Sequence, residues 1–189
     1  FDPDTARDMI FKLATILRRL LNSSEAFAPL REELEFIDNY LDIEVVRFGR
    51  EKLRVVKELD PASLDVVVPS MLLQPLIENS IKHGLAPKIE GGSIYLRSRV
   101  TNSRLIIEVE DDGVGMGGAQ LEESSSWSGM GIGMANISER LQVLYGDTAR
   151  MTIDSHEGKG TLIRIRLPLI EAASSVPEGF YAERSSTRR

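Results

Sequence analysis

The first fifty residues carry two stretches whose apolar side chains recur with the spacing of an amphipathic helix. One stretch covers residues 5–21 and the other covers residues 29–49. A polar Asn-Ser-Ser cluster separates them, and Pro29 can begin the second helix because proline suits the first helical turn. Two consecutive amphipathic helices predict a helical hairpin, which either packs on its own domain or forms a dimerisation element.

After residue 51 the apolar positions change to the alternation that is typical of β-strands. A short strand is predicted over 52–59, an apolar run follows at 66–68, and helical spacing returns over 70–84. The later predicted elements are a hairpin of strands 93–100 and 104–111, a helix over 134–145, and a hairpin of strands 149–155 and 160–167.

Two segments lack this periodicity. Residues 112–133 are rich in glycine and serine, and a loop of this length in a compact domain is usually functional or mobile. Residues 171–189 are rich in Ser, Glu and Arg and poor in apolar side chains, which predicts a disordered tail. The chain therefore divides into a helical hairpin at 1–50, a folded domain at 51–170 and the tail.

Composition and charge narrow the classes of function. The chain has 189 residues and a formal net charge of -6, which argues against a nucleic-acid partner bound through a basic face. It has no cysteine, so disulfides, thiolate nucleophiles and cysteine-ligated zinc are excluded, and two histidines argue against a histidine-rich metal site. No apolar run approaches the roughly 18 residues of a membrane span. Because the first residue is Phe1, we expect a fragment of a longer protein.

The predicted helix over 70–84 carries four polar side chains among its apolar ones, namely Glu78, Asn79, Lys82 and His83. The i,i+4 spacing places Glu78 with Lys82, and Asn79 with His83, on shared faces of a helix. A carboxylate, an amide oxygen able to bind Mg²⁺ and two cationic or proton-donating groups are the parts that phosphoryl chemistry requires. A solvated helix face with an i,i+4 ion pair is the alternative interpretation.

Asp111 continues the inward apolar positions of the predicted strand 104–111. A carboxylate in an apolar series is costly unless it finds a hydrogen-bond donor, and the exocyclic amine of a purine is such a donor. Gly113 and Gly115 follow it and allow the backbone to approach a flat ligand closely. A plain turn at the end of a strand is the alternative interpretation of these five residues.

Glycines alternate at Gly129, Gly131 and Gly133, just before the predicted helix over 134–145. The backbone amides of such a loop and a helix N-terminus suit phosphate groups, although the spacing is neither a dinucleotide fingerprint nor a Walker A loop. A Gly-x-Gly-Thr turn that ends at Thr161 lies between the last two strands, and a hairpin turn by itself explains it. Alone, each motif is a weak signal.

Taken in order, the four motifs resemble the N, G1, G2 and G3 boxes of the GHKL ATPase superfamily, which includes DNA gyrase, heat-shock chaperones, mismatch-repair ATPases and histidine kinases. Within it the sequence is most similar to the LytS-type sensor histidine kinases. Their Pro-x-x-x-Leu-Gln-Pro-Leu-x-Glu-Asn-x-x-x-His-Gly pattern stands at 69–84, and their Gly-Ile-Gly-x-x-Asn-x-x-x-Arg-Leu pattern stands at 131–141. The segment 30–48 is also similar to the helix before their ATPase domain, so the resemblance covers residues 30–168.

This resemblance implies a Bergerat fold, an α+β two-layer sandwich of a mixed sheet with helices on one face, preceded by the helical hairpin. Residues 51–170 are then a histidine-kinase-like ATPase domain, and residues 1–50 are the remnant of a dimerisation and phosphotransfer region. The resemblance also implies ATP and Mg²⁺ as cofactors, a response regulator as partner, and a homodimer formed through the N-terminal helices. It further implies that the chain is the cytoplasmic portion of a membrane-anchored kinase.

At the adenine end, the resemblance implies that Asp111 accepts a hydrogen bond from the exocyclic amine. Gly113 and Gly115 leave space for the ring, and Thr161 supports this end through Asp111 or a bound water. These roles come from the family motifs and not from the spacing alone.

At the phosphate end, the resemblance implies that Asn79 holds Mg²⁺ against the phosphates and that Glu78 acts as general base toward the acceptor. Lys82 and His83 lie near the phosphates. The backbone amides that approach the phosphates belong to Gly129, Gly131 and Gly133.

One departure from the family concerns the phosphoacceptor histidine, which lies there in a Pro-His-Phe-x-x-Asn box upstream of the hairpin. The chain lacks that box, and neither His83 nor His156 can replace it. We therefore expect the ATP-binding part of a kinase that transfers the γ-phosphate to a histidine upstream of this chain. The alternative is a nucleotide-gated dimerisation or interaction module that binds ATP without phosphotransfer, but the presence of Glu78 favours an enzyme. An anti-sigma serine kinase shares the fold, but the Leu-Gln-Pro-Leu signature and the hairpin argue against it.

Overall fold

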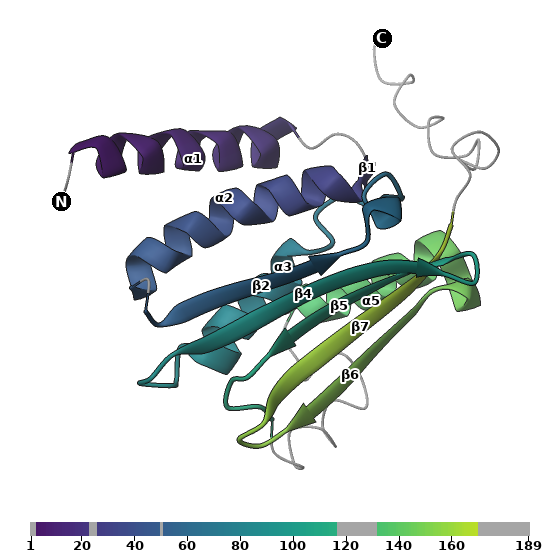
Figure 1. The fold of residues 1–189 in the computed structure, drawn as a ribbon. Helices are drawn as coiled ribbons and strands as arrows, with labels where there is room; N and C mark the ends of the chain where they lie inside the picture. Colours follow the sequence, from purple (N-terminus) through teal and green to yellow (C-terminus); the bar gives the residue numbers. More distant parts are fainter. Residues whose placement is uncertain (1–2, 23–25, 50, 117–131, 170–189) are drawn as a thin grey trace, which may run out of the picture.

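A computed structural model of the chain describes residues 3–22, 26–49, 51–116 and 132–169 (Figure 1). The predicted tail at 171–189 and most of the glycine- and serine-rich stretch lie outside the described residues. Within them the structure combines helices with a five-stranded mixed sheet.

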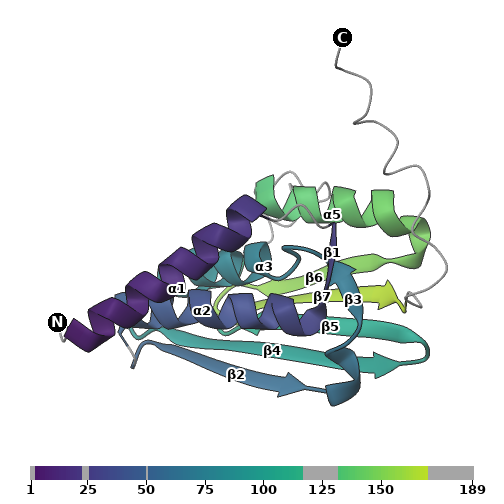
Figure 2. The ribbon, with the colours of Figure 1, turned by 90° about the horizontal axis from the view of Figure 1, so that it is seen from above.

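Two long helices begin the chain, as the hydrophobic pattern predicts. Helix α1 (Pro3–Asn22) packs along helix α2 (Leu30–Phe48), with Ile16 nearly buried between them and an ion pair of 2.7 Å from Lys12 to Asp42. Pro29 is the residue that precedes the first turn of α2, where its missing N–H costs nothing. Figure 2 shows α1 on the outer side of α2, away from the sheet.

The main sheet has the strand order β2-β4-β5-β7-β6. Its strands are β2 (Leu53–Leu59), β4 (Gly92–Thr101), β5 (Arg104–Asp111), β6 (Arg150–His156) and β7 (Gly160–Pro168). Strands β2 and β4 are parallel, and every other neighbouring pair is antiparallel, so the sheet is mixed. Asn102 and Ser103 join β4 to β5 with φ angles of 49° and 57°, the conformation of a tight two-residue hairpin turn.

The helices lie on one face of this sheet (Figures 1 and 2). Helix α2, the short helix α3 (Gln74–Asn79) and helix α5 (Ile132–Tyr145) share one hydrophobic core with the inward side chains of the strands. The largest fully buried side chains of this core include Leu30, Ile37, Leu76, Ile77, Ile94, Leu96, Leu105, Ile107 and Met134. The prediction of a mixed sheet with helices on one face and a preceding helical pair is therefore confirmed. The domain division at residue 50 stays a prediction.

The predicted helix over 70–84 differs in detail. It begins only at Gln74, because Met71 has a φ of 60° that no right-handed helix can accommodate. After Asn79 it continues as one turn of π-helix (Ser80–Leu85), closed by a hydrogen bond of 2.8 Å from the Ala86 amide to the Ile81 carbonyl. Such turns are rare and frequent at functional sites.

Short elements complete the described structure. Strand β1 (Phe27–Pro29) pairs antiparallel with β3 (Val67–Pro69) in a small second sheet, and single 3₁₀ turns occur at Pro61–Ser63 and Gly146–Thr148. Three-residue strands carry too little alternation for the sequence to reveal them. The small sheet joins the entrance of α2 to the segment that leads into α3.

Candidate functional site

The site is built around Asp111, the last residue of β5, which is only 2% exposed. As predicted, its side chain lies on the face of the sheet that the helices cover, in line with Ile107 and Val109. Its Oδ1 accepts a hydrogen bond of 3.0 Å from the backbone N–H of Gly113. The turn after the strand therefore holds the carboxylate in one orientation.

Burial raises the pKa of the Asp111 carboxyl, and the neighbouring Asp112 adds to this rise. The hydroxyl of Ser80 and the backbone amides of Gly113 and Thr161 act in the opposite direction but do not cancel it. Among the described residues no Lys, Arg or His forms an ion pair with Asp111. A buried carboxylate without a cation is costly, which favours a ligand that supplies a donor.

Two glycines allow close packing beside this carboxylate. A Cβ on Gly84 would lie 2.5 Å from Asp111 Oδ1, and a Cβ on Gly113 would lie 2.4 Å from the Gly84 backbone. The π-helical turn and the strand end therefore touch backbone to backbone, tied by a hydrogen bond of 3.0 Å from the Val114 amide to the Gly84 carbonyl. Any side chain at 84 would displace the carboxylate, so the glycine is required there.

The β6–β7 hairpin supports the same end of the sheet. Thr161 lies opposite Asp111 on β7, and its hydroxyl is 2.8 Å from the hydroxyl of Ser155, which accepts the Met116 amide at 2.9 Å. Gly115 has a φ of 65° and packs so closely on the His156 carbonyl that a Cβ would lie 2.0 Å from that oxygen. The predicted residues Thr161 and Gly115 thus lie within the same cluster as Asp111.

Glu78 lies on α3 in an ion pair that the spacing predicted. Lys82 Nζ is 2.8 Å from Glu78 Oε2, and Gln74 Nε2 donates to Glu78 Oε1 at 2.8 Å. Burial raises the pKa of the Glu78 carboxyl, but the hydrogen bonds from Lys82 and Gln74 outweigh it, and the pKa is lowered overall. Glu78 is therefore ionised at neutral pH and able to accept a proton or orient a hydroxyl or imidazole.

The other two polar residues of this segment are placed differently. Asn79 ends α3 and is half-buried, whereas His83 lies on the π-helical turn and is exposed. The described structure shows no hydrogen bond between their side chains, so only one of the two predicted i,i+4 pairs is in contact. No cluster of three or more His, Cys, Asp or Glu side chains that could hold a metal ion occurs within the described ranges.

Gly133 is the one member of the glycine series that can be placed. It lies in the first turn of α5, where a Cβ would lie 3.4 Å from Pro75 Cβ, so α5 begins beside α3. Gly129 and Gly131 lie outside the described residues. The helix that follows the glycine series therefore begins next to the helix that carries Glu78 and Asn79.

Sequence reasoning missed the contribution of α2 to this region. Burial, together with the negative charges of Glu44 and Glu78, raises the pKa of Tyr40 far above its ordinary value. Tyr40 is therefore within electrostatic range of both Glu44 and Glu78, although Glu78 comes 38 residues later in the sequence. The apolar spacing over 29–49 includes neither Tyr40 nor Glu44, and no local motif indicated that Glu78 would influence Tyr40.

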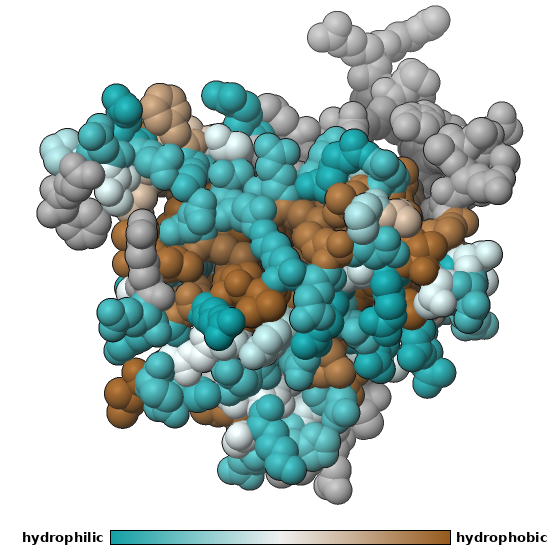
Figure 3. Space-filling view, viewed as in Figure 1, coloured by the Kyte–Doolittle hydropathy of each residue, from teal (hydrophilic) through white to brown (hydrophobic). Residues whose placement is uncertain are grey.

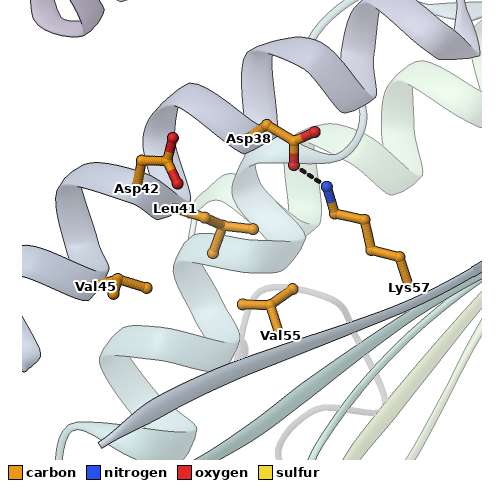
Figure 4. A pocket seen from close by; sticks show the side chains of 6 residues that line it. All are labelled: Asp38, Leu41, Asp42, Val45, Val55 and Lys57. Atoms are coloured by element: carbon orange, nitrogen blue, oxygen red, sulfur yellow. Dashed lines mark hydrogen bonds and ion pairs between the residues drawn. The ribbon is translucent and has the colours of Figure 1, made fainter. Parts of the chain in front are cut away.

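A separate groove of about 580 Å³ lies between α2 and β2 (Figure 4). Figure 3 shows apolar surface in this part of the molecule. Its charged residues are paired with one another or with α1, Asp38 with Lys57 and Asp42 with Lys12. Its lining residues include no glycine and no free cation, so it lacks the donors that a polyphosphate requires. The cluster around Asp111 is therefore the candidate ligand site.

Comparisons with known proteins identify the family of the chain. A family model described as histidine kinase-, DNA gyrase B- and HSP90-like ATPase matches residues 65–171, and a histidine kinase model matches residues 1–53. Among curated proteins, the chain is 32% identical over 160 residues to the sensor histidine kinase YesM of Bacillus subtilis. It is 31% identical over 176 residues to the sensor protein LytS of Oceanobacillus iheyensis. These alignments cover 85% and 88% of this chain but only 27% and 30% of the relatives.

Solved structures show the same fold. The histidine kinase domain of the blue-light activated kinase EL346 of Erythrobacter litoralis aligns with a TM-score of 0.56 and 22% identity, over 89% of this chain and 76% of that one. The catalytic domain of histidine kinase ThkA aligns with a TM-score of 0.59 and 15% identity, over 76% of this chain and 95% of that one. In the described ranges no helix combines the length and apolar character that crossing a membrane requires. The fold, the site and the match over residues 65–171 together place this chain in the family of histidine kinase-, DNA gyrase B- and HSP90-like ATPases.

Proposed function

We propose that this chain is the ATP-binding catalytic part of a sensor histidine kinase, which transfers the γ-phosphate of ATP to a histidine upstream of Phe1. The observation that carries the proposal is Asp111, a buried carboxylate that has no cation beside it among the described residues and is backed by glycines. The similarity to sensor kinases, which spans only about a quarter to a third of their length, supports the reaction type.

Asp111 selects adenine through its ionised carboxylate. The exocyclic amine of adenine donates to this acceptor, whereas guanine presents the O6 acceptor at the same position and meets repulsion. Gly84 and Gly113 let the π-helical turn and the end of β5 pack against each other beside the carboxylate, since a Cβ at 84 would meet Asp111 and a Cβ at 113 would meet the Gly84 backbone. Gly115 and Thr161 fix the neighbouring backbone and strand end from the other side.

Glu78 acts on the acceptor, while Asn79 and the cations act on the phosphates. Lys82 neutralises phosphate charge once its ion pair with Glu78 opens. The exposed side chain of His83 reaches the same phosphate region. The amide oxygen of Asn79 would hold Mg²⁺ near the phosphates, and the ion would supply the charge neutralisation that phosphoryl transfer requires. The amide of Gly133 donates to the phosphates at the start of α5, and the family motif implies the same role for Gly129 and Gly131.

Partners of the whole protein follow from the same proposal. A response regulator receives the phosphoryl group, and both ATP and such a regulator place this part of the protein in the cytoplasm. Homodimerisation uses α1, because one side of this helix exposes a stripe of apolar side chains that packs on nothing described. The stripe consists of Ile10, Leu13, Leu17 and Leu21, of which Ile10 is 68% and Leu21 is 84% exposed.

Calorimetry on this chain tests the nucleotide assignment. ATP with Mg²⁺ is expected to bind more tightly than GTP with Mg²⁺, and removal of Mg²⁺ with a chelator is expected to weaken ATP binding. Equal affinities for ATP and GTP would remove the basis for the role of Asp111.

Phosphotransfer is tested on a longer protein that includes the upstream histidine, with Glu78→Gln as the variant. Gln keeps the volume of Glu but cannot accept a proton, so ATP should bind normally while transfer falls by roughly 100-fold or more. Normal transfer by this variant excludes the base role. A wild-type protein that binds ATP but never transfers phosphate would instead establish the nucleotide-gated interaction module.

A further inference from the structure

The segment 70–73 joins strand β3 to helix α3 and is held in an unfavourable conformation. Met71 has a φ of 60°, in the left-handed region where a side chain meets the backbone and glycine is favoured. Leu73 immediately precedes Gln74, the first residue of α3. The conformation of this segment therefore sets where α3 begins and which way Glu78 and Asn79 point.

Glu33 of α2 holds this segment from one side. Its carboxylate is 1% exposed, and it accepts the Met71 amide at Oε1, at 2.9 Å, and the Leu73 amide at Oε2, at 3.3 Å. A buried carboxylate persists when donors compensate its lost hydration, and charge-assisted hydrogen bonds do so most strongly. The two amides that it binds flank the turn at residue 72, so both ends of the turn are fixed.

Arg140 of α5 holds the same segment from the other side. Its guanidinium donates to the Ser70 carbonyl and, at 2.7 Å, to the Ala26 carbonyl. The Ala26 carbonyl also accepts the Ser70 amide at 3.1 Å. Two helices, one on each side of α3 in the sequence, thus meet at a four-residue segment that contains no catalytic group.

We propose that Glu33 is a positioning residue of the nucleotide site, which holds Met71 in its left-handed conformation and so fixes α3 with Glu78 and Asn79. Arg140 completes this support from α5, the helix that follows the glycine series. The proposal rests on the proposed function in that nucleotide affinity is its main readout. It assigns to a buried carboxylate on α2 a role that is distinct from the packing of that helix.

The first test compares Glu33→Gln with Glu35→Gln, a control on the exposed side of the same helix. Gln keeps the volume of Glu but offers only one acceptor oxygen. Its NH₂ group takes the place of the second oxygen and cannot accept a hydrogen bond from the other backbone N–H. The affinity for Mg-ATP, measured by calorimetry well below the melting temperature, is expected to fall roughly tenfold for Glu33→Gln. The control is expected to bind as the wild type does. Unchanged affinity of a folded Glu33→Gln protein would overturn the proposal.

Rescue by glycine separates positioning from general destabilisation. Met71→Gly removes the Cβ that opposes the left-handed conformation, so the turn forms without the carboxylate. The double variant Glu33→Gln/Met71→Gly is expected to recover most of the affinity, while Met71→Gly alone stays near wild type. Absence of recovery would show that Glu33 does not act through this turn. If Glu33→Gln does not fold, Arg140→Lys replaces it, with a smaller loss and the same expected rescue.

Amide hydrogen exchange on the nucleotide-free protein keeps this proposal separate from the proposed function. Glu33→Gln is expected to speed amide exchange at Leu73 and at Ile77, because the Ile77 amide donates to the Leu73 carbonyl at 3.1 Å. The control Glu35→Gln is expected to leave exchange at both amides unchanged. If the wild type fails to bind ATP while this exchange still changes, the proposed function is wrong and the positioning of α3 stands. If exchange at both amides is unchanged, the positioning is wrong whatever the chain binds.

Discussion

Two buried carboxylates on strand β5 lie close together in sequence and face opposite sides of the sheet. Glu108 is 5% exposed on the open face, where Arg99 donates to it at 2.9 Å and Arg164 donates from the neighbouring strand. Asp111 is 2% exposed on the helix-covered face, and its nearest donor with normal geometry is the Gly113 amide. The same strand therefore carries one carboxylate that is fully paired and one that is not.

Their pKa values move in opposite directions for this reason. Burial raises the pKa of both carboxyls, but at Glu108 the hydrogen bonds and charges of Arg99 and Arg164 outweigh burial and lower it. At Asp111 burial prevails and the pKa is raised. A carboxylate whose partners are already present is a structural ion pair, and one that is buried without a cation is a candidate for a ligand site.

The sharpest test of this contrast is Asp111→Asn. Asn retains an oxygen for the Gly113 amide but loses the charge that binds the adenine amine, so ATP affinity should fall by about 1–3 kcal/mol, or roughly 5- to 150-fold. Calorimetry with Mg-ATP measures this loss. The thermal stability of the free protein should stay the same or rise, since the charge is costly there. A variant that unfolds readily would show that Asp111 is structural after all.

Gly84→Ala tests the space beside Asp111 without changing any charge. Its Cβ would lie 2.5 Å from Asp111 Oδ1, so the carboxylate or the π-helical turn must move. We expect a loss of about 1–3 kcal/mol in the free energy of unfolding, which is typical of overpacking, together with weaker ATP binding. Urea denaturation and calorimetry measure the two effects. Wild-type values in both would mean that the contact relaxes freely.

Glu108→Gln provides the opposite result to Asp111→Asn. The substitution leaves two arginines without their shared carboxylate and should lower the free energy of unfolding by about 1–3 kcal/mol. Nucleotide affinity should not change, because the side chain lies on the other face of the sheet. Urea denaturation at neutral pH checks the first statement, and any large loss of ATP binding would contradict the second.

The dependence on pH should also separate the two residues. The pKa of Glu108 is lowered by folding, so its stabilisation is present above the unfolded pKa and is lost as pH falls through the folded value. The pKa of Asp111 is raised, so its favourable contribution is present at low pH and is lost as pH rises through the folded value. Acidification should therefore shrink the stability difference between wild type and Glu108→Gln. ATP binding should weaken as pH falls, because Asp111 is protonated, and this loss should begin at a pH above the ordinary Asp pKa of about 3.9.

Glu110→Gln should have the smallest effect. Its carboxylate lies on the same open face as Glu108 but is bonded to Arg97 alone, at 2.5 Å, and its side chain is 40% exposed. Solvent screens such a pair, so the expected loss is about 0–1 kcal/mol in urea denaturation. A loss equal to that of Glu108→Gln would show that the number of arginine partners does not matter.

Much of the fold could be predicted because local pattern and tertiary structure agree. The alternation over 104–111 placed Asp111 on the covered face, and Asn102 with Ser103 marked the turn before it. The pair of Glu78 and Lys82 followed from helical spacing alone. The small sheet of β1 and β3 could not be found, because strands of three residues are too short to show a period.

The sequence by itself determined the type and order of the long helices and strands, since hydrophobic period, turn residues and the order of four motifs are properties of the chain. It could not determine where α3 begins, because the segment 70–73 before it is bonded by Glu33 and Arg140 from helices far apart in sequence. It also could not show that Gly84 touches Asp111. Those contacts join distant segments, and only the packing of helices against the sheet brings their donors, acceptors and missing side chains together.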